Sequence, residues 1–180
     1  FLACFYEQRK LAKADTISKL MQSKKSLKYA KFLMEQPLIF KKEIIFKNKS
    51  KKVIMVHAGI PPNLSLENCF DLNKEFQVAL KKNPKRILKK VFNNPFSKFS
   101  KKMSKIDRII FFANALTRIR ACNHKGEIDF NFKGRINEIP KKLNAWFNFE
   151  NSIISGNSQL IFGHWAAIKG ETKKKDIFGL

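Results

Sequence analysis

The sequence predicts one mixed α/β domain in which helices flank short strands. Segments with apolar residues at helical spacing alternate with short apolar runs that are bounded by turn residues. A hydrophobic fraction of 44%, with 18 phenylalanines, is sufficient for a packed core. No internal repeat or low-complexity linker interrupts residues 1–180. A single domain over residues 1–180 is therefore the simplest organisation.

The first elements expected are helices followed by a β-hairpin. Residues 1–36 carry apolar groups at helical spacing, including Ala30 and Met34, and predict one or two helices that end before Pro37. Two apolar runs then flank "KNKSKK" (47–52), a pattern typical of a hairpin with a long, charged turn.

Helices are expected again in the middle of the chain. Ser65 is a candidate N-cap for a helix that runs to about Lys82. Residues 83–104 are basic and contain two prolines, which predicts short helices on the surface. The segment "KIDRIIFFANALTRIR" (105–120) repeats apolar residues every three or four positions and predicts a buried helix.

Short strands are expected in the last third of the chain. "RACNHKGEIDF" (120–130) predicts a hairpin whose turn carries Gly126. Residues 133–158 resemble a loop, and strands are expected in "QLIFGHW" (159–165) and "DIFGL" (176–180). With antiparallel pairing, these strands and the helices give an α/β or α+β sandwich.

The formal net charge of +23 permits polyanionic partners, including nucleic acid. However, most of the positive residues are lysines spread along the chain as pairs, whereas arginine is the usual residue for bidentate phosphate or base contacts. A compositional origin is the favoured interpretation. A basic nucleic-acid-binding protein without catalysis is the alternative function.

Other features of the sequence indicate the cellular compartment and the part of the gene product that the chain represents. No run approaches the roughly 18 apolar residues of a membrane helix, and no membrane partner is expected. Three cysteines, Cys4, Cys69 and Cys122, lack metal-type spacing and are expected as small core residues in a reducing cytoplasm. The chain begins on Phe1 and ends within a strand-like phrase, so we expect a piece of a longer gene product.

Two of the three histidines share a context. His57 and His164 each follow a short apolar strand and adjoin a glycine, in "HAG" and "GHW". A histidine at a strand end is more often structural, yet two of them beyond the carboxyl ends of strands suit an imidazole pair that converges on a metal. His124 lies in the predicted hairpin turn, where exposure to solvent is expected. Two imidazoles make only half a coordination sphere, so no complete active site is visible.

Arg118 and Arg120, in "TRIR", lie where the buried helix meets the hairpin strand. Alternate residues of an extended segment face the same way, so this pair could clamp a phosphate. The alternative is two solvated surface arginines. Trp146 and Trp165 are mainly core candidates, with stacking on adenine as a minor possibility.

The ordered set "VIMVHAGIPP", "FFANALTRIRAC", "NAWF" and "FGHWAAIKG" resembles the bacterial symmetrical diadenosine tetraphosphatases of the calcineurin-like metallophosphoesterase superfamily. The resemblance runs over residues 1–180 and is poor in 81–105. It implies a β-sandwich flanked by helices, and two divalent metal ions, Mn²⁺ or Co²⁺, bridged by a hydroxide. It also implies a small dinucleoside polyphosphate as partner, hydrolysed to two ADP.

Carried onto this chain, the resemblance makes His57 and His164 ligands of one metal, and Arg118 and Arg120 contacts to the polyphosphate. The family's motifs GDxHG, GDxxxRG and GNHD are missing from the sequence. We therefore expect the middle-to-C-terminal portion of a single domain, cut at both ends, with an incomplete sandwich and no catalysis of its own. A decayed reading frame is a third interpretation.

Overall fold

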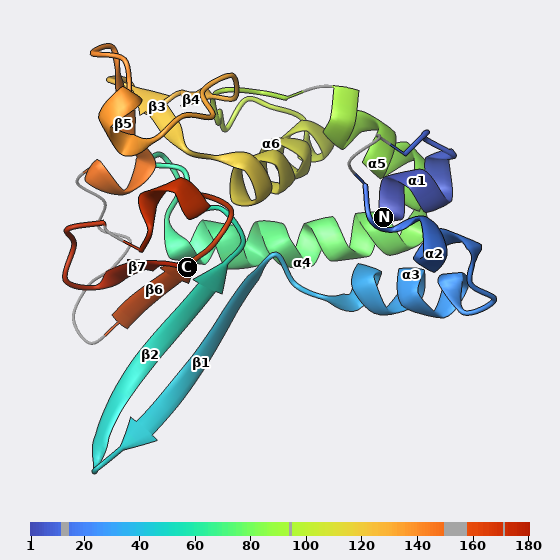
Figure 1. Ribbon diagram of the computed structural model, residues 1–180, viewed down its shortest axis with the longest axis horizontal. Coiled ribbons are helices and arrows are strands. Elements are labelled where there is room, and N and C mark those ends of the chain that lie inside the picture. Colours follow the sequence, from blue (N-terminus) through green and yellow to red (C-terminus); the bar gives the residue numbers. More distant parts are fainter. Residues whose placement is uncertain (12–14, 94, 150–157, 171) are drawn as a thin grey trace.

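The prediction of a mixed α/β fold is confirmed. In a computed structural model, helices form one side of the molecule, and sheets together with a long protruding hairpin form the other (Figure 1). The residues that the structure describes are 1–11, 15–93, 95–149, 158–170 and 172–180, except for the side chain of Phe46.

The N-terminal region is divided into more helices than the sequence predicted. Its described residues form α1 (Leu2–Glu7), α2 (Ser18–Gln22) and α3 (Ser26–Glu35), so the prediction of one or two helices was wrong, whereas the end before Pro37 is confirmed. The extended backbone of Ser23, with ψ 137, ends α2, although the apolar spacing continues across the break. Periodicity alone therefore hid this boundary.

The predicted hairpin is present, but its turn is short. Strands β1 (Ile39–Phe46) and β2 (Lys49–Val56) pair antiparallel, and only Lys47 and Asn48 connect them. Both turn residues have positive φ, 48° and 59°, as expected of a tight hairpin turn whose twist matches that of the strands. The prediction of a long charged turn was wrong because charged residues can continue a strand whose side chains lie in solvent.

The larger sheet has the strand order β1-β2-β6-β7, where β6 is Ser158–Phe162 and β7 is Ile177–Gly179. Strand β2 pairs with β6 in parallel, and β6 pairs with β7 in parallel. The expectation of antiparallel strands was wrong for these pairs. The chain leaves β2 at one end of the sheet and returns through a long crossover that contains helices, which is the connection that parallel pairing needs.

The crossover begins with two capped helices. Ser65 accepts a hydrogen bond from the backbone N–H of Asn68 (3.1 Å) and caps α4 (Leu66–Lys82), as predicted. Helix α5 (Pro84–Asn93) follows at once, because proline fits the first turn of a helix, where its missing N–H is not needed. This basic segment is thus a helix whose buried Ile87 and Leu88 face the body of the protein.

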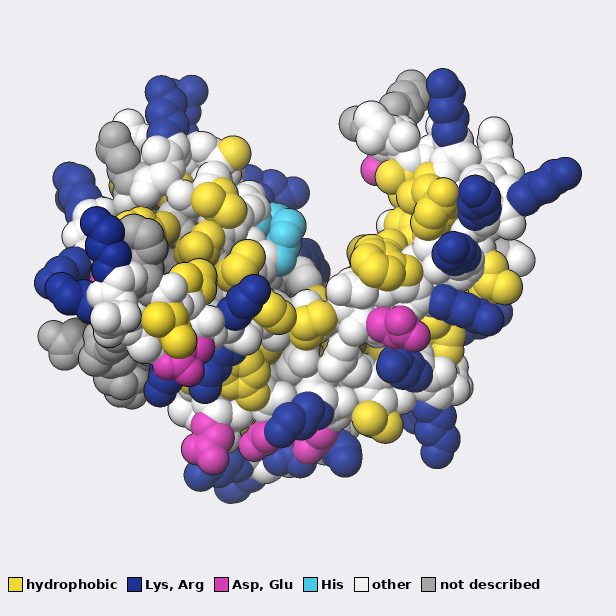
Figure 2. Space-filling view, turned by 90° about the horizontal axis from the view of Figure 1, so that it is seen from below, with side chains coloured by type: hydrophobic (Ala, Val, Ile, Leu, Met, Phe, Trp, Pro, Cys, Tyr) yellow, Lys and Arg dark blue, Asp and Glu magenta, His cyan; other side chains and the backbone are white. Residues whose placement is uncertain are grey.

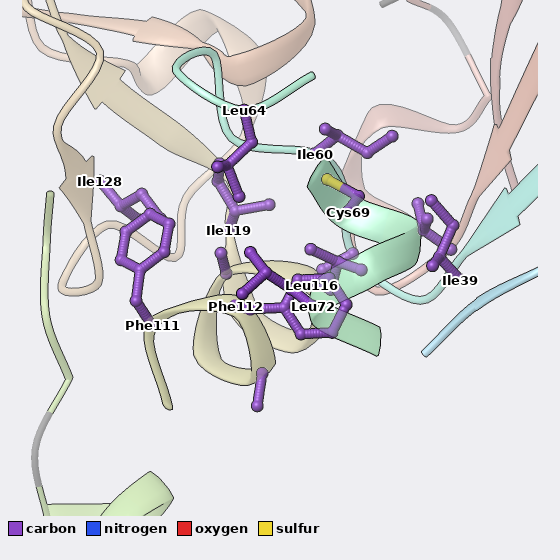
Figure 3. Packing of buried hydrophobic residues seen from close by; sticks show 14 of the residues in the cluster. Ile39, Ile60, Leu64, Cys69, Leu72, Phe111, Phe112, Leu116, Ile119 and Ile128 are labelled. Atoms are coloured by element: carbon purple, nitrogen blue, oxygen red, sulfur yellow. The ribbon is translucent and has the colours of Figure 1, made fainter. Parts of the chain in front are cut away.

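Helix α6 (Lys105–Arg118) is the centre of the core, as its spacing predicted. Its N-cap, Ser104, accepts a hydrogen bond from the backbone N–H of Asp107 (3.1 Å). Figure 3 shows apolar side chains of α6 meeting those of α4 and of the loop after β2. The fully buried residues that these elements contribute include Phe111, Phe112, Leu116, Cys69 and Ile60.

A smaller antiparallel sheet follows α6, with strand order β4-β3-β5. Strands β3 (Ala121–Asn123) and β4 (Ile128–Asp129) form the predicted hairpin, whereas β5 (Leu143–Ala145) lies in a region that was predicted to be a loop. Three-residue strands carry no readable alternation, so this error follows from their length. Residues 150–157 of that region lie outside the described residues. Short 3₁₀ helices also occur: η1 (Ile136–Glu138), η2 (Trp146–Asn148) and η3 (Ala166–Ile168).

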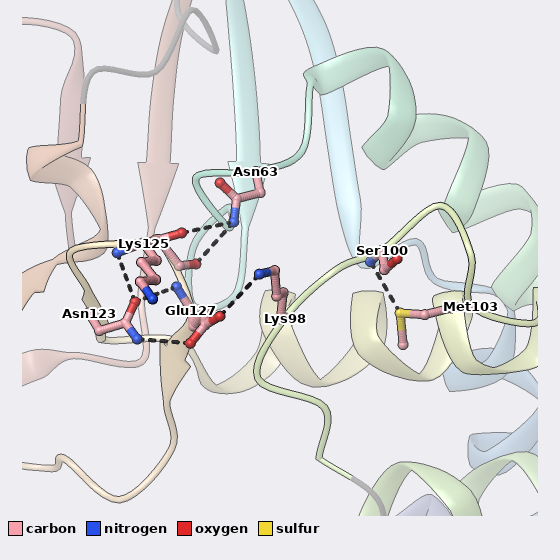
Figure 4. Close-up of polar contacts among 8 residues, drawn as sticks. Asn63, Lys98, Ser100, Met103, Asn123, Lys125 and Glu127 are labelled. Carbon is pink, nitrogen blue, oxygen red and sulfur yellow. Dashed lines mark hydrogen bonds and ion pairs between the residues drawn. The ribbon is translucent and has the colours of Figure 1, made fainter.

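The β3–β4 turn is held by a small polar network (Figure 4). The Asn123 side chain accepts from the backbone N–H of Lys125 (2.9 Å) and donates to the Glu127 carboxylate (2.9 Å). The hydrogen bond from Asn123, followed by the contact with Lys98, lowers the pKa of Glu127. Asn63, from the loop after β2, donates to the Lys125 carbonyl (3.4 Å), so this loop and the hairpin turn are tied together.

Among the described helices, none is both long enough and apolar enough to cross a membrane.

The buried cysteines lead to a prediction about reactivity. Burial raises the pKa of Cys69 and of Cys122 to about 12, and the Asp129 charge adds to the effect on Cys122. Both thiols are therefore protonated from pH ~7 to ~9, whereas only the thiolate is nucleophilic. In the native chain we expect a thiol-reactive disulfide reagent to titrate only the half-buried Cys4. In urea all three cysteines should react; rapid native reaction of more than one thiol would contradict the buried assignment.

Candidate functional site

The parallel pairing of β2 and β6 brings the carboxyl ends of both strands to one edge of the sheet. Val56 lies opposite Phe162 at the end of the ladder. His57 is the first residue after β2, and its carbonyl accepts a hydrogen bond from the backbone N–H of Gly163 (2.8 Å). His164 follows immediately, so both histidines leave the sheet side by side.

The structure brings together the side chains of the two histidines that the sequence singled out. Nε2 of His57 lies 3.2 Å from Nδ1 of His164. The ring centroids are 5.0 Å apart, and the ring planes are inclined by 56°. His57 is exposed, whereas His164 is partly buried. Nε2 of His57 and Nδ1 of His164 therefore lie next to each other at the edge of the sheet where β2 and β6 end.

His164 has an unusual backbone conformation. Its φ of 65° lies in the left-handed region, which residues other than glycine rarely adopt. The chain is fixed on both sides of it, by the Gly163 contact with His57 and by Trp165, whose indole N–H donates to the Gly134 carbonyl (2.9 Å). Strained residues of this kind cluster at functional sites, where the surrounding structure holds them in place.

The electrostatics of the pair favour neutral imidazole on His164. Burial first, then the positive charges of Arg120, His57 and Arg118, lowers its pKa to about 4. A neutral imidazole is the form that binds metal ions. Nε2 of His164 is buried and has no hydrogen-bond partner among the described residues.

Arg118 is held in position by Asn114 and Phe130. Its Nη1 donates to the side-chain oxygen of Asn114 (3.0 Å), and its guanidinium lies over the Phe130 ring, 4.9 Å from the centroid. Asn114 is completely buried, and its amide donates to the carbonyls of Val91 (2.9 Å) and Ile110 (3.1 Å). This asparagine was not identified from the sequence. The available signal was a polar residue on a buried helix face, four positions before an arginine.

Arg120 comes from the extended segment that follows α6. Its carbonyl accepts a hydrogen bond from the backbone N–H of Trp146 (3.0 Å), and burial lowers its pKa from the usual value. An arginine nevertheless stays charged at neutral pH. Arg118 is the last residue of α6, so the premise that both arginines lie on one extended segment was wrong. Both charges still contribute to the lowered pKa of His164.

The remaining candidates lie outside the histidine pair. His124 is exposed in the β3–β4 turn, as predicted. Trp146 and Trp165 are 1% and 2% exposed, so the prediction that they are core residues is confirmed. Buried to this extent, neither indole offers a free face for stacking on a base.

Trp146 explains the glycine of the "HAG" motif. A Cβ on Gly59 would lie 2.6 Å from Nε1 of Trp146, closer than real Cβ atoms approach other atoms. The indole therefore packs directly on the backbone of the loop that carries His57. The backbone N–H of Ala58 also donates to the Leu116 carbonyl (2.8 Å), which fastens the same loop to α6.

The two imidazoles fit one side of a metal site. Two nitrogens that each lie about 2.0–2.1 Å from one tetrahedral ion are about 3.3 Å apart, close to the 3.2 Å between the rings. The same distance is that of a hydrogen bond between two neutral imidazoles. Among the described residues, no group of three or more His, Cys, Asp or Glu side chains could hold a metal ion. These residues therefore offer two imidazole nitrogens and two cations.

The surface around the site is hollowed and basic. Figure 2 shows histidine side-chain atoms on the wall of a deep hollow that separates two lobes. Apolar side chains line part of the opposite lobe, and Lys and Arg side chains are scattered over this face without forming one stripe.

No family model matches the chain. The chain is 31% identical over 159 residues to a symmetrical bis(5'-nucleosyl)-tetraphosphatase of Coxiella burnetii, which covers 87% of this chain and 52% of that protein. The protein of the same name from Wigglesworthia glossinidia brevipalpis is 32% identical over 183 residues, 99% of this chain and 65% of the relative. The one from Pseudomonas putida is 28% identical over 181 residues, 99% of this chain and 60% of the relative. The chain thus spans about half to two thirds of the length of these relatives.

The contact between Gly59 and Trp146 can be tested by substitution. Because an added methyl group would overlap the indole, we expect Gly59→Ala to lower the free energy of unfolding by about 1–3 kcal/mol, the usual range for overpacking. Gly163→Ala is the matched control, since its Cβ would meet the His57 carbonyl at an ordinary 3.5 Å. Urea denaturation monitored by tryptophan fluorescence measures both. Equal stability of the two variants would show that Trp146 does not require this glycine.

Proposed function

We propose, because the chain belongs to the family of the symmetrical bis(5'-nucleosyl)-tetraphosphatases, that it forms part of an enzyme that hydrolyses diadenosine tetraphosphate to two ADP. One observation of the structure carries the proposal. Two imidazole nitrogens converge to 3.2 Å at the carboxyl edge of a parallel strand pair, beside two arginines. Metal ligands next to cations suit the hydrolysis of a polyphosphate anion.

His57 and His164 would hold one of two divalent metal ions, with Mn²⁺ or Co²⁺ as the expected metals. When bound, such ions polarise phosphoryl oxygens and lower the pKa of water. The contribution of this chain is to fix both rings: the sheet ladder places His57, and the left-handed backbone places His164. Rigid placement of donor atoms is what a metal site requires of its protein.

Arg118 and Arg120 would bind the phosphate oxygens of the substrate. Guanidinium groups bind phosphates through charge-assisted hydrogen bonds, and their charge stabilises the negative charge that is redistributed during phosphoryl transfer. Asn114 keeps the Arg118 guanidinium oriented through a bond anchored in the core. An arginine fixed before the substrate arrives loses less conformational entropy on binding.

The described residues alone supply too few ligands for two metal ions, since they contain no cluster of three or more metal-binding side chains. We therefore propose that the 180-residue chain by itself is inactive. The complete site would use further ligands in addition to this pair, whose side-chain atoms lie on the wall of a hollow (Figure 2).

The proposal can be tested by a gain of activity. With diadenosine tetraphosphate and Mn²⁺ or Co²⁺, the 180-residue chain should release no ADP above background. Joined to the segments of the Wigglesworthia relative that it does not span, it should become active. In the joined protein, His57→Ala should lower the rate about 100-fold or more, because even the loss of an outer-shell partner of a metal ligand costs about 10–100-fold.

His124→Ala is the matched control, because this histidine is exposed in a turn away from the pair. ADP release is followed by chromatography. An active joined protein in which His57→Ala and His124→Ala are equally active would overturn the metal-ligand assignment.

The arginine assignment predicts a kinetic effect. In the joined protein, Arg118→Ala should reduce kcat/KM by about 10- to 100-fold, since a hydrogen bond to a charged group contributes about 1.5–3 kcal/mol. The binding of Mn²⁺ should be unchanged, because Arg118 donates and cannot act as a ligand. Arg86→Ala, an exposed arginine on α5, controls for the loss of one positive charge. If both variants keep the parent kcat/KM, Arg118 does not contact the substrate.

A further inference from the structure

Helix α5 has two faces of opposite character. Its buried residues, Ile87 and Leu88, pack on the body of the protein. Its other face borders a hollow of about 410 Å³, and the described residues that line this hollow are all cationic or amide residues: Asn83, Lys85, Arg86, Lys89, Lys90 and Asn93. In Figure 1, α5 lies beside α1 on the helical side of the molecule. All four charges of α5 are positive and border the hollow.

These four cations are placed where they oppose helix formation. Residues four positions apart are neighbours on a helix, so Lys85 repels Lys89 and Arg86 repels Lys90. Lys85 and Arg86 also lie in the first turn, where the helix dipole favours acidic residues, and this turn contains none. The stability of α5 therefore does not explain its cationic face. An anion against this face would offset both effects.

The contacts around α5 do not neutralise this face. The ion pairs between described residues include none of its four cations. Glu7 of α1, which packs beside α5, is paired with Arg9 (3.5 Å), and its side chain is only 8% exposed. Arg9 also donates from Nη2 to the side-chain oxygen of Asn93 (3.0 Å), so it brings a fifth cation to one end of the hollow.

The lining suits the backbone of a duplex better than unpaired bases. Single strands are bound through stacking on aromatic rings as well as through charge. None of the described residues that line the hollow is aromatic, and Arg9 lies over the neighbouring Phe92 ring, 4.5 Å from its centroid. Lysine, arginine and amide side chains contact phosphate oxygens without reading the bases. A duplex also carries the denser line of phosphates.

We propose that the cationic face of α5 binds the phosphate backbone of duplex DNA without reading its sequence. The hollow includes neither His57 nor His164 in its lining, and the proposal does not depend on the hydrolase function. Helix α5 also lies in residues 81–105, where the resemblance to the tetraphosphatases is poor. A lysine-rich composition accounts for the number of cations, but not for the absence of acidic residues from this helix.

The test is fluorescence anisotropy of a labelled 20-base-pair DNA duplex, titrated with the 180-residue chain at several salt concentrations in the presence of a metal chelator. The variant Lys85→Gln/Arg86→Gln/Lys89→Gln/Lys90→Gln removes the four charges and keeps residues that favour a helix. It should bind at least about tenfold more weakly at 0.1 M salt. Its slope of log affinity against log salt should be shallower by about 3–4, since each phosphate contact contributes about 0.9.

Lys24→Gln/Lys25→Gln/Lys28→Gln/Lys31→Gln is the matched control, because it removes four exposed lysines in and before α3 that do not line the hollow. It should keep the affinity and the salt slope of the parent. Equal weakening by both variants would mean general attraction by the net charge and would overturn the proposal, as would the absence of binding at 50 mM salt.

Two further measurements separate the proposal from its alternatives. A single strand of the same length should bind about fivefold more weakly than the duplex at 0.1 M salt, because its slope per contact is shallower. Equal or tighter binding of the single strand contradicts a site for duplex DNA. In thermal unfolding the α5 variant should be at least as stable as the parent, because like-charge repulsion is removed. A lower unfolding temperature would show that the cations stabilise the fold instead.

Discussion

The parallel pairing of β2 with β6 is the constraint on which the candidate site depends. Its register is set by burial: Ile54 and Val56 of β2 and their partners Leu160 and Phe162 of β6 all face the core. Burying one such side chain contributes about 1.5–3 kcal/mol, and a shift by one residue would turn all of them to the opposite face. The same register fixes where each strand ends. The apolar core therefore determines how far apart the two imidazoles lie, without any direct requirement for a metal.

The end of α6 provides the second half of this arrangement. The carbonyl of Leu116 holds the loop that carries His57, and the carbonyl of Arg120 holds the backbone of Trp146. Trp146 in turn packs on Gly59, so the loop is fixed between a helix end and an indole. Four sequence motifs that are far apart in the chain thus meet through backbone contacts. These motifs are neighbours in space because the crossover between β2 and β6 makes the two strands parallel, so that both end at one edge of the sheet.

Local features of the fold could be predicted from the sequence, and contacts between distant segments could not. The Ser65 cap, the buried helix α6 and the strands that end in His57 and His164 each depend on short-range patterns. Parallel pairing of β2 and β6 has no local signal, because it depends on where a crossover of about a hundred residues leaves the chain. The role of Asn114 was hidden for the same reason. Its amide matters because it is buried between two helices, which only tertiary packing decides.

The charge around the histidine pair restricts what can complete the site. The two imidazoles bring no negative charge, and Arg118 and Arg120 bring two positive charges. At an effective dielectric constant of 20, two like unit charges 4 Å apart repel each other by about 4 kcal/mol, and a divalent ion doubles that value. A metal ion beside these arginines therefore requires anionic ligands beyond the two histidines. A polyphosphate and carboxylates meet this requirement together, because each neutralises part of the charge and both bind through oxygen. The chain thus contributes the neutral and cationic half of the proposed site, and the half that completes it must be acidic.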